Sequence, residues 1–147
     1  MNAAVFGLTA MSLLLLGASA PSGAVDVHVT TVHASAHGRS DRELLEHRPR
    51  LRRLVGYRAF RMVGEERRRC TWQSGEEFAI PGGRQLRVVP QGMRDQAVRL
   101  RVQILDGERA LVDTDVCLQN RGMMLFGVDQ VEGADGEALI IMLKAKR

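Results

Sequence analysis

The first 24 residues contain no charged side chain, and this limits which part of the chain can belong to a folded domain. The segment from Ala3 to Leu16 is almost wholly apolar, and small residues with one proline follow it. This arrangement is typical of a secretory signal peptide, which is removed from the mature protein. We therefore interpret residues 1–24 as a signal peptide and residues 25–147 as a single periplasmic or secreted domain.

Two positions in this segment satisfy the small-residue rule for cleavage. Cleavage after Ala20 would place Pro21 directly beyond the cut, which hinders it, so cleavage after Ala24 is favoured. The alternative is an uncleaved membrane anchor. Its apolar core is shorter than the roughly 20 residues that a spanning helix needs. The first basic residue downstream is Arg39, so no basic flank fixes an orientation in a membrane.

The remaining residues are enough for one domain that buries roughly two thirds of its unfolded surface. All the charged residues lie in this part, and the net charge is +4. The basic residues are concentrated in residues 25–69, because the acids slightly outnumber the bases in residues 70–147. Arginine far outnumbers lysine, which codon usage in a GC-rich genome is sufficient to explain.

The hydrophobic pattern predicts a mainly β fold. Val25, Val27 and Val29 alternate with polar residues, which predicts a strand over residues 25–32 with the three valines facing the core. From Tyr57 onward the chain is expected to form seven or eight short strands, with turns about every 8–12 residues. The fold class is therefore mainly β with one short kinked helix (α+β), in a single small antiparallel β-sandwich or barrel-like domain.

The helix is expected after a loop over residues 33–39. Ser40 and Glu43 have the spacing of a capping box, which predicts a helix that begins at Asp41. Pro49 should end or kink this helix and begin a second short helical turn. Gly56 is expected to stop that turn.

The strand boundaries follow from glycine, proline and charged residues. Residues 64–66 are expected to form a turn between two strands, and residues 132–136 an exposed tip. A three-residue turn at Pro81-Gly82-Gly83 would pair Phe78 with Leu86. The last strand is expected over residues 138–144, and its residues 139–143 are apolar on both faces, which predicts a central or covered position.

Two registers compete for the hairpin over residues 97–118. A two-residue turn at Asp106-Gly107 would pair Leu100 with Asp113 and place a charge on the core face. A three-residue loop that adds Leu105 would pair Leu100 with Val112 instead, with Gly107 in a left-handed conformation. The hydrophobic pattern favours the three-residue loop.

Cys70 and Cys117 are the two cysteines. An even number of cysteines in an exported chain suggests a disulfide, and this one would stabilise the fold by roughly 4 kcal/mol in the chain-entropy model. The alternative is two buried free thiols that pack as small hydrophobic groups. We favour the disulfide.

A cluster of arginines is the main candidate binding site. Guanidinium groups bind phosphate and carboxylate through two parallel hydrogen bonds. Outside the cytoplasm such a cluster would meet anionic lipid, acidic glycan or extracellular DNA, and nucleic acid is disfavoured because the aromatic residues lack the spacing of a stacking platform. The alternative is a solvated face paired with nearby glutamates. The candidate residues are Arg48, Arg50, Arg52, Arg53, Arg67, Arg68 and Arg69.

No motif predicts catalysis, a metal ion or a cofactor. The histidines at positions 28, 33, 37 and 47 are the best metal candidates, but their spacing does not place them on one face of a strand. The chain contains no G-x-S-x-G nucleophile motif. Gly82 and Gly83 lack the lysine of a phosphate-binding loop.

Two classes of function therefore remain. The first is a non-enzymatic structural or interaction domain of the periplasm or cell surface, which binds an envelope protein through a sheet edge or a loop face. The alternative is a module that binds anionic lipid or glycan through residues 48–69. Binding driven by charge would weaken as the salt concentration rises, and this difference separates the two classes.

Overall fold

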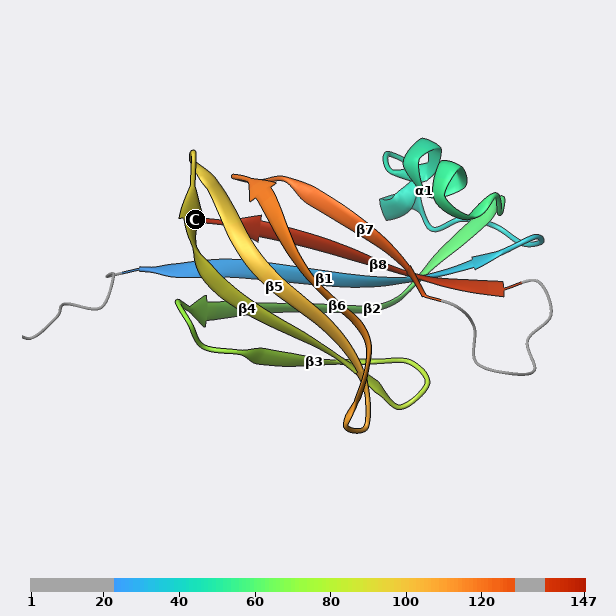
Figure 1. The fold of residues 1–147 in the computed structure, drawn as a ribbon. Helices are drawn as coiled ribbons and strands as arrows, with labels where there is room; N and C mark the ends of the chain where they lie inside the picture. The colour runs from blue at the N-terminus through green and yellow to red at the C-terminus, as the bar shows by residue number, and fades with distance from the viewer. Residues whose placement is uncertain (1–22, 129–136) are drawn as a thin grey trace, which may run out of the picture.

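Two four-stranded antiparallel sheets and one helix make up the part of the chain that the computed structural model describes, residues 23–128 and 137–147. Sheet A has the strand order β2-β1-β8-β7, and sheet B has the order β3-β4-β5-β6. The two sheets enclose a core to which both contribute, and the helix lies at one end of sheet A (Figure 1). This arrangement agrees with the predicted mainly β class and with a small β-sandwich.

The elements follow one another along the chain with short connections. Their bounds are β1 (Ala24–Ser35), η1 (Arg42–Leu44), α1 (Arg48–Val55), β2 (Ala59–Thr71), β3 (Glu76–Ile80), β4 (Arg84–Arg94), β5 (Ala97–Asp106), β6 (Arg109–Gln119), β7 (Met123–Val128) and β8 (Glu137–Lys146). The predicted signal peptide up to residue 22 and the predicted tip at residues 132–136 lie outside the described residues.

The first and last strands behave as their sequences predict. Val25, Val27 and Val29 of β1 are buried in the core between the sheets. β8 pairs with β1 on one side and β7 on the other, which is the central position expected of a strand apolar on both faces. β1 nevertheless runs to Ser35, so the loop predicted from residue 33 begins later than expected.

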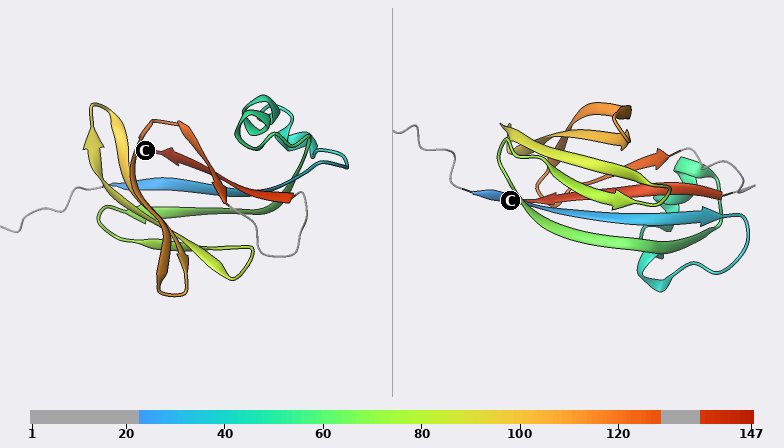
Figure 2. Two further views of the ribbon diagram at one scale, coloured as in Figure 1. Left: turned by 45° about the vertical axis from the view of Figure 1, so that its right-hand side comes forward. Right: turned by 90° about the horizontal axis from the view of Figure 1, so that it is seen from below.

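The helical segment lies beside sheet A at the end where β1 ends and β8 begins (Figure 2). A second apolar cluster lies between this segment and the sheet. Ile140 and Met142 of β8 pack there with Leu51 of α1 and Leu44 of η1. This cluster explains why β8 is apolar on both faces, because the helical segment shields its second face from water.

The predicted turn at residues 64–66 is wrong, because β2 is one continuous strand from Ala59 to Thr71. Thr31 pairs with Gly64 and Val32 pairs with Met62, so the chain accommodates Val63 as a β-bulge rather than a turn. Pairing with β1 along nearly its whole length holds this segment extended despite its glycine and its charges.

The predicted capping box is also wrong. η1 has Asp41 as its N-cap, with no capping hydrogen bond from that side chain. The two polar side chains satisfy backbone groups of β2 instead: Phe60 N–H donates to Ser40 Oγ (3.1 Å), and Met62 N–H donates to Asp41 Oδ2 (2.7 Å). The second helical turn is confirmed, with Pro49 at its start and a left-handed Gly56 (φ 71°) at its end.

The hairpins of sheet B divide into one correct and one wrong prediction. Phe78 pairs with Leu86 across the turn between β3 and β4, as expected. In the β5–β6 hairpin, Asp106 pairs with Arg109 across a two-residue turn, Gly107-Glu108, and Leu100 pairs with Val116. Neither register considered from the sequence is present, although Gly107 is left-handed as predicted (φ 60°).

A bulge accounts for the register error. Ile104 pairs with Val112 and Leu105 pairs with Ala110, so Leu111 has no partner on β5. With the two-residue turn alone, Val112, Val116 and Leu118 would face away from the core. The extra residue at the bulge returns these three side chains to the core face of β6. The three-residue loop would have placed Ala110 opposite Val102 on the core face, but Ala110 pairs with Leu105 and is exposed.

Candidate functional site

Two rows of polar residues cross the outer face of sheet A at the end opposite the helix. Asp26 of β1 lies between Arg69 of β2 and Lys146 of β8. Two residues further along the strands, His28 lies between Arg67 of β2 and Lys144 of β8. Because alternate residues of a strand face the same side, these six side chains belong to one face of the sheet.

These rows line a hollow of about 540 Å³, which we name the basic hollow. Arg121, in the turn between β6 and β7, adds a further cation, and its backbone N–H donates to Ala145 O of β8 (3.0 Å). The cationic side chains that face the hollow from the sheet and this turn are Arg67, Arg69, Arg121, Lys144 and Lys146. Five cations from three separate parts of the chain are therefore gathered on one surface.

A glutamate occupies part of this surface. Glu65 Oε1 lies 2.6 Å from His28 Nε2 and 3.3 Å from Arg67 Nη2, so one carboxylate contacts both side chains. Burial lowers the pKa of His28, and the charges of Arg67 and Lys144 lower it further. The hydrogen bond with Glu65 acts in the opposite direction, but the pKa remains below its ordinary value. His28 is therefore uncharged near neutral pH, and Glu65 then offsets mainly the charge of Arg67.

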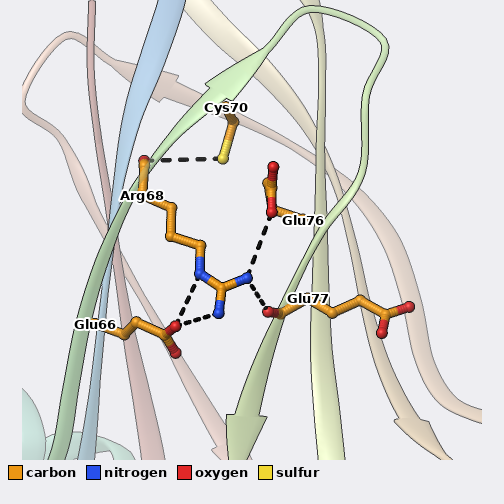
Figure 3. Close-up of polar contacts among 5 residues, drawn as sticks. All are labelled: Glu66, Arg68, Cys70, Glu76 and Glu77. Atoms are coloured by element: carbon orange, nitrogen blue, oxygen red, sulfur yellow. Dashed lines mark hydrogen bonds and ion pairs between the residues drawn. The ribbon is translucent and has the colours of Figure 1, made fainter.

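Arg68 lines the basic hollow together with Arg67 and Arg69, but its guanidinium group is bound elsewhere. Its side chain lies on the opposite face of β2 and links this edge strand of sheet A with β3, an edge strand of sheet B (Figure 3). Arg68 Nε donates to Glu66 Oε1 (2.8 Å), and Nη1 donates to the backbone oxygen of Glu77 on β3 (2.6 Å).

Two further contacts fix Arg68 in this position. Its Nη1 lies 3.4 Å from Glu76 Oε2, and its guanidinium lies 5.1 Å from the centre of the Phe78 ring. The hydrogen bond with Glu66 raises the pKa of Arg68 further above its usual value. We conclude that the guanidinium group of Arg68 links β2 with β3 and is already bound by protein groups.

The four helical arginines of the predicted patch lie on a different part of the same face. Arg50, Arg52 and Arg53 are exposed on α1, and Arg48 is half-buried at its start. Burial, and then the charge of Lys144, lower the pKa of His47, the N-cap of α1. The arginine-rich segment is therefore divided between the helix, the hollow and the seam between the sheets.

The predicted disulfide between Cys70 and Cys117 is wrong, because both thiols are free. Cys70 of β2 faces the core, where burial raises the pKa of its thiol to about 11. Val116 and Leu118, the neighbours of Cys117 on β6, face the core, so Cys117 between them faces solvent on the other side of sheet B. The two side chains therefore point in directions that a short bridge cannot join.

The histidines are dispersed over the fold. Among residues 23–128 and 137–147, no group of three or more histidine, cysteine or acidic residues is arranged to hold a metal ion. Trp72 lies just beyond β2, packs half-buried against the core and lines a second hollow of about 520 Å³ with Gln73 and Gln91. No feature of the sequence indicated this second hollow.

Sequence reasoning missed Lys144, Lys146 and Arg121 as partners of Arg67 and Arg69. The available signal was the alternation at the end of β8, where both lysines fall on the same face. Their meeting with the arginines depends on β1 and β8 being neighbours, which one sequence does not reveal.

None of the helices in the described part of the chain is both long and apolar enough to cross a membrane. Comparison of the chain with models of protein families, with curated proteins and with solved structures gives no match.

Proposed function

We propose that this protein is a non-catalytic binding domain outside the cytoplasm, and that its basic hollow binds the anionic groups of a lipid or a glycan. The observation that supports this most is the pair of cross-strand rows, in which Arg67 and Lys144 flank His28 while Arg69 and Lys146 flank Asp26. Cations that the sheet itself holds side by side are ready to bind an anion with little further ordering.

The chemistry of these side chains suits an oxyanion of phosphate, sulfate or carboxylate. The arginine guanidinium groups offer two parallel donors, and the lysine ammonium groups act as point charges. The hollow is wide enough for a charged headgroup or a sugar unit, at about 540 Å³. The arginines of α1 on the same face of sheet A would attract a larger polyanion at longer range.

A second candidate function is the binding of an envelope protein through β6. This strand forms one edge of sheet B, and in the described part of the chain it pairs only with β5. Leu111 and Cys117 are exposed along it. An open edge of this length can accept a strand from a partner through backbone hydrogen bonds, which depend little on salt.

The test is binding measured at low and at high salt with two anionic probes. Heparin represents a sulfated glycan, and vesicles of phosphatidylglycerol with phosphatidylcholine represent an anionic membrane. We expect binding to at least one probe at low salt and a loss of more than about tenfold in affinity at high salt, because exposed charges are then screened. Vesicles of phosphatidylcholine alone are the uncharged control.

Failure to bind either probe at low salt would contradict the proposal. Recovery of an envelope protein that remains bound at high salt, combined with no binding to either probe, would support the β6 candidate instead. Binding to phosphatidylcholine vesicles at the same strength would show that charge is not the basis of recognition.

A further inference from the structure

The basic hollow contains a histidine and a glutamate whose contacts change with protonation. We propose that the hollow binds anions of fixed charge more tightly as the pH falls, because protonated His28 engages Glu65 and thereby releases Arg67 to the ligand. This inference rests on the proposed function, and it adds the control of that same site by acid.

Glu65 is the carboxylate for which protonated His28 and Arg67 compete. His28 Nε2 is 2.6 Å from Glu65 Oε1, and Arg67 Nη2 is 3.3 Å from the same oxygen. Thr30 Oγ1 lies 3.4 Å from His28 Nε2, so the ring is held by neighbours on both β1 and β2. The His28 side chain is 21% exposed, so solvent protons reach it.

The charged residues around His28 come mainly from the two strands that flank β1. β2 contributes Glu65, Arg67 and Arg69, and β8 contributes Lys144 and Lys146. Asp26 on β1, Arg68 on β2 and Arg121 in the β6–β7 turn also line the hollow, and His47 at the start of α1 interacts electrostatically with Lys144. Cations predominate in this set, so a proton on His28 joins a site that is already positive.

The charge balance sets the direction of the effect. Burial lowers the pKa of His28 below the ordinary value of about 6.5, so the ring is neutral at neutral pH. Glu65 then offsets the charge of Arg67. When acid protonates His28, the imidazolium and Glu65 form the closer pair, and the charge of Arg67 is no longer offset. The hollow gains one positive charge and one free guanidinium.

The same balance indicates the chemical class of the ligand. A phosphomonoester has its second pKa at about 6, so it loses negative charge over the pH range in which His28 gains positive charge. A sulfate ester or a phosphodiester keeps its charge throughout that range. Protonation of His28 therefore strengthens binding only for a ligand whose charge stays constant, so the ligand presents sulfate ester or phosphodiester groups.

The experiment measures the affinity of the purified protein for heparin at constant ionic strength, from about pH 7.5 to about pH 5.5, where histidine titrates. We expect an increase of about three- to tenfold toward acid, as one added charge close to the ligand would produce. In the same material, binding of heparin should raise the pKa of His28 observed by NMR, because the coupling between proton and ligand is reciprocal.

Variants assign the effect to this histidine. His28→Gln should gain less than about twofold in heparin affinity between about pH 7.5 and about pH 5.5, measured against its own affinity at the higher pH. The matched control is His37→Gln, which removes an exposed histidine of the loop after β1 and should keep the full gain. Glu65→Gln should bind more tightly than the unmodified protein at neutral pH, because Arg67 is free at every pH.

The outcomes separate this inference from the proposed function. Salt-sensitive binding of heparin that does not change with pH, or a full acid gain in His28→Gln, would overturn the inference alone. If neither heparin nor anionic vesicles bind at any pH in the range, the proposed function fails, and the inference fails with it.

Discussion

Replacing Leu100 with alanine is expected to lower the free energy of unfolding by about 2–5 kcal/mol, the range for truncating a large aliphatic side chain in a closed core. Leu100 is 0% exposed and lies on β5 between Pro90 of β4 and Val116 of β6. The neighbouring strands hold its surroundings in place, so the truncation leaves a cavity that the fold cannot readily fill. Equilibrium unfolding in urea measures the loss.

The matched control is Leu111→Ala, the same chemical change at the unpaired bulge residue of the edge strand β6. Leu111 is 37% exposed, so its truncation should cost less than about 1 kcal/mol. Equal losses for the two variants would contradict the observed register, because that register places only Leu100 inside the core.

Reversing the charge of Arg67 and Lys144 together, with Arg67→Glu and Lys144→Glu, is expected to weaken heparin binding by at least about a hundredfold at low salt. These residues flank His28 on its two neighbouring strands, so the change replaces a whole cationic row with an anionic one. Four units of charge change close to the ligand, and each contributes on the order of 1 kcal/mol near a protein surface. Affinity measured by calorimetry gives the result.

A control variant carries the same change in net charge on the opposite sheet. Arg87→Glu with Arg99→Glu alters two exposed cations on β4 and β5, and heparin affinity should fall by less than about tenfold through long-range repulsion alone. Circular dichroism should show both variants folded. If the control loses as much affinity as the variant of the hollow, recognition depends on total charge, and the basic hollow is not the site.

Features of the fold that depend on neighbouring residues in the chain could be predicted from the sequence. The turn at residues 81–83 contains two glycines and pairs Phe78 with Leu86, and Gly56 ends α1 in the left-handed conformation that glycine adopts readily. The apolar residues 139–143 of β8 correctly indicated a central strand that is covered on both faces.

Features that depend on distant pairing could not be predicted. The sequence around Gly64 resembles a turn, yet β1 holds it in a long strand with a bulge at Val63. The bulge at Leu111 changed the β5–β6 register, and the alternation of apolar and polar residues in the sequence does not show where such an extra residue is inserted. Ser40 matched a capping motif, but it accepts a hydrogen bond from β2, which follows it by a long interval in the chain.

The candidate site shows the same division. The sequence identified Arg67, Arg68 and Arg69 as one cluster, but successive residues of a strand face opposite sides, and Arg68 is therefore turned toward β3. The lysines that complete the basic hollow come from the last strand. They meet the arginines only because β1 lies between β2 and β8 in sheet A.

The most direct test of the central claim, that the basic hollow is the binding site, is to map the residues that contact the ligand. Backbone amide NMR of the protein titrated with a short heparin oligosaccharide measures this residue by residue. The structure predicts that the largest shifts fall on residues 26–28, 67–69 and 144–146, with Arg121 beside them. Shifts confined to α1, or to sheet B around Arg99 and Arg101, would contradict the account.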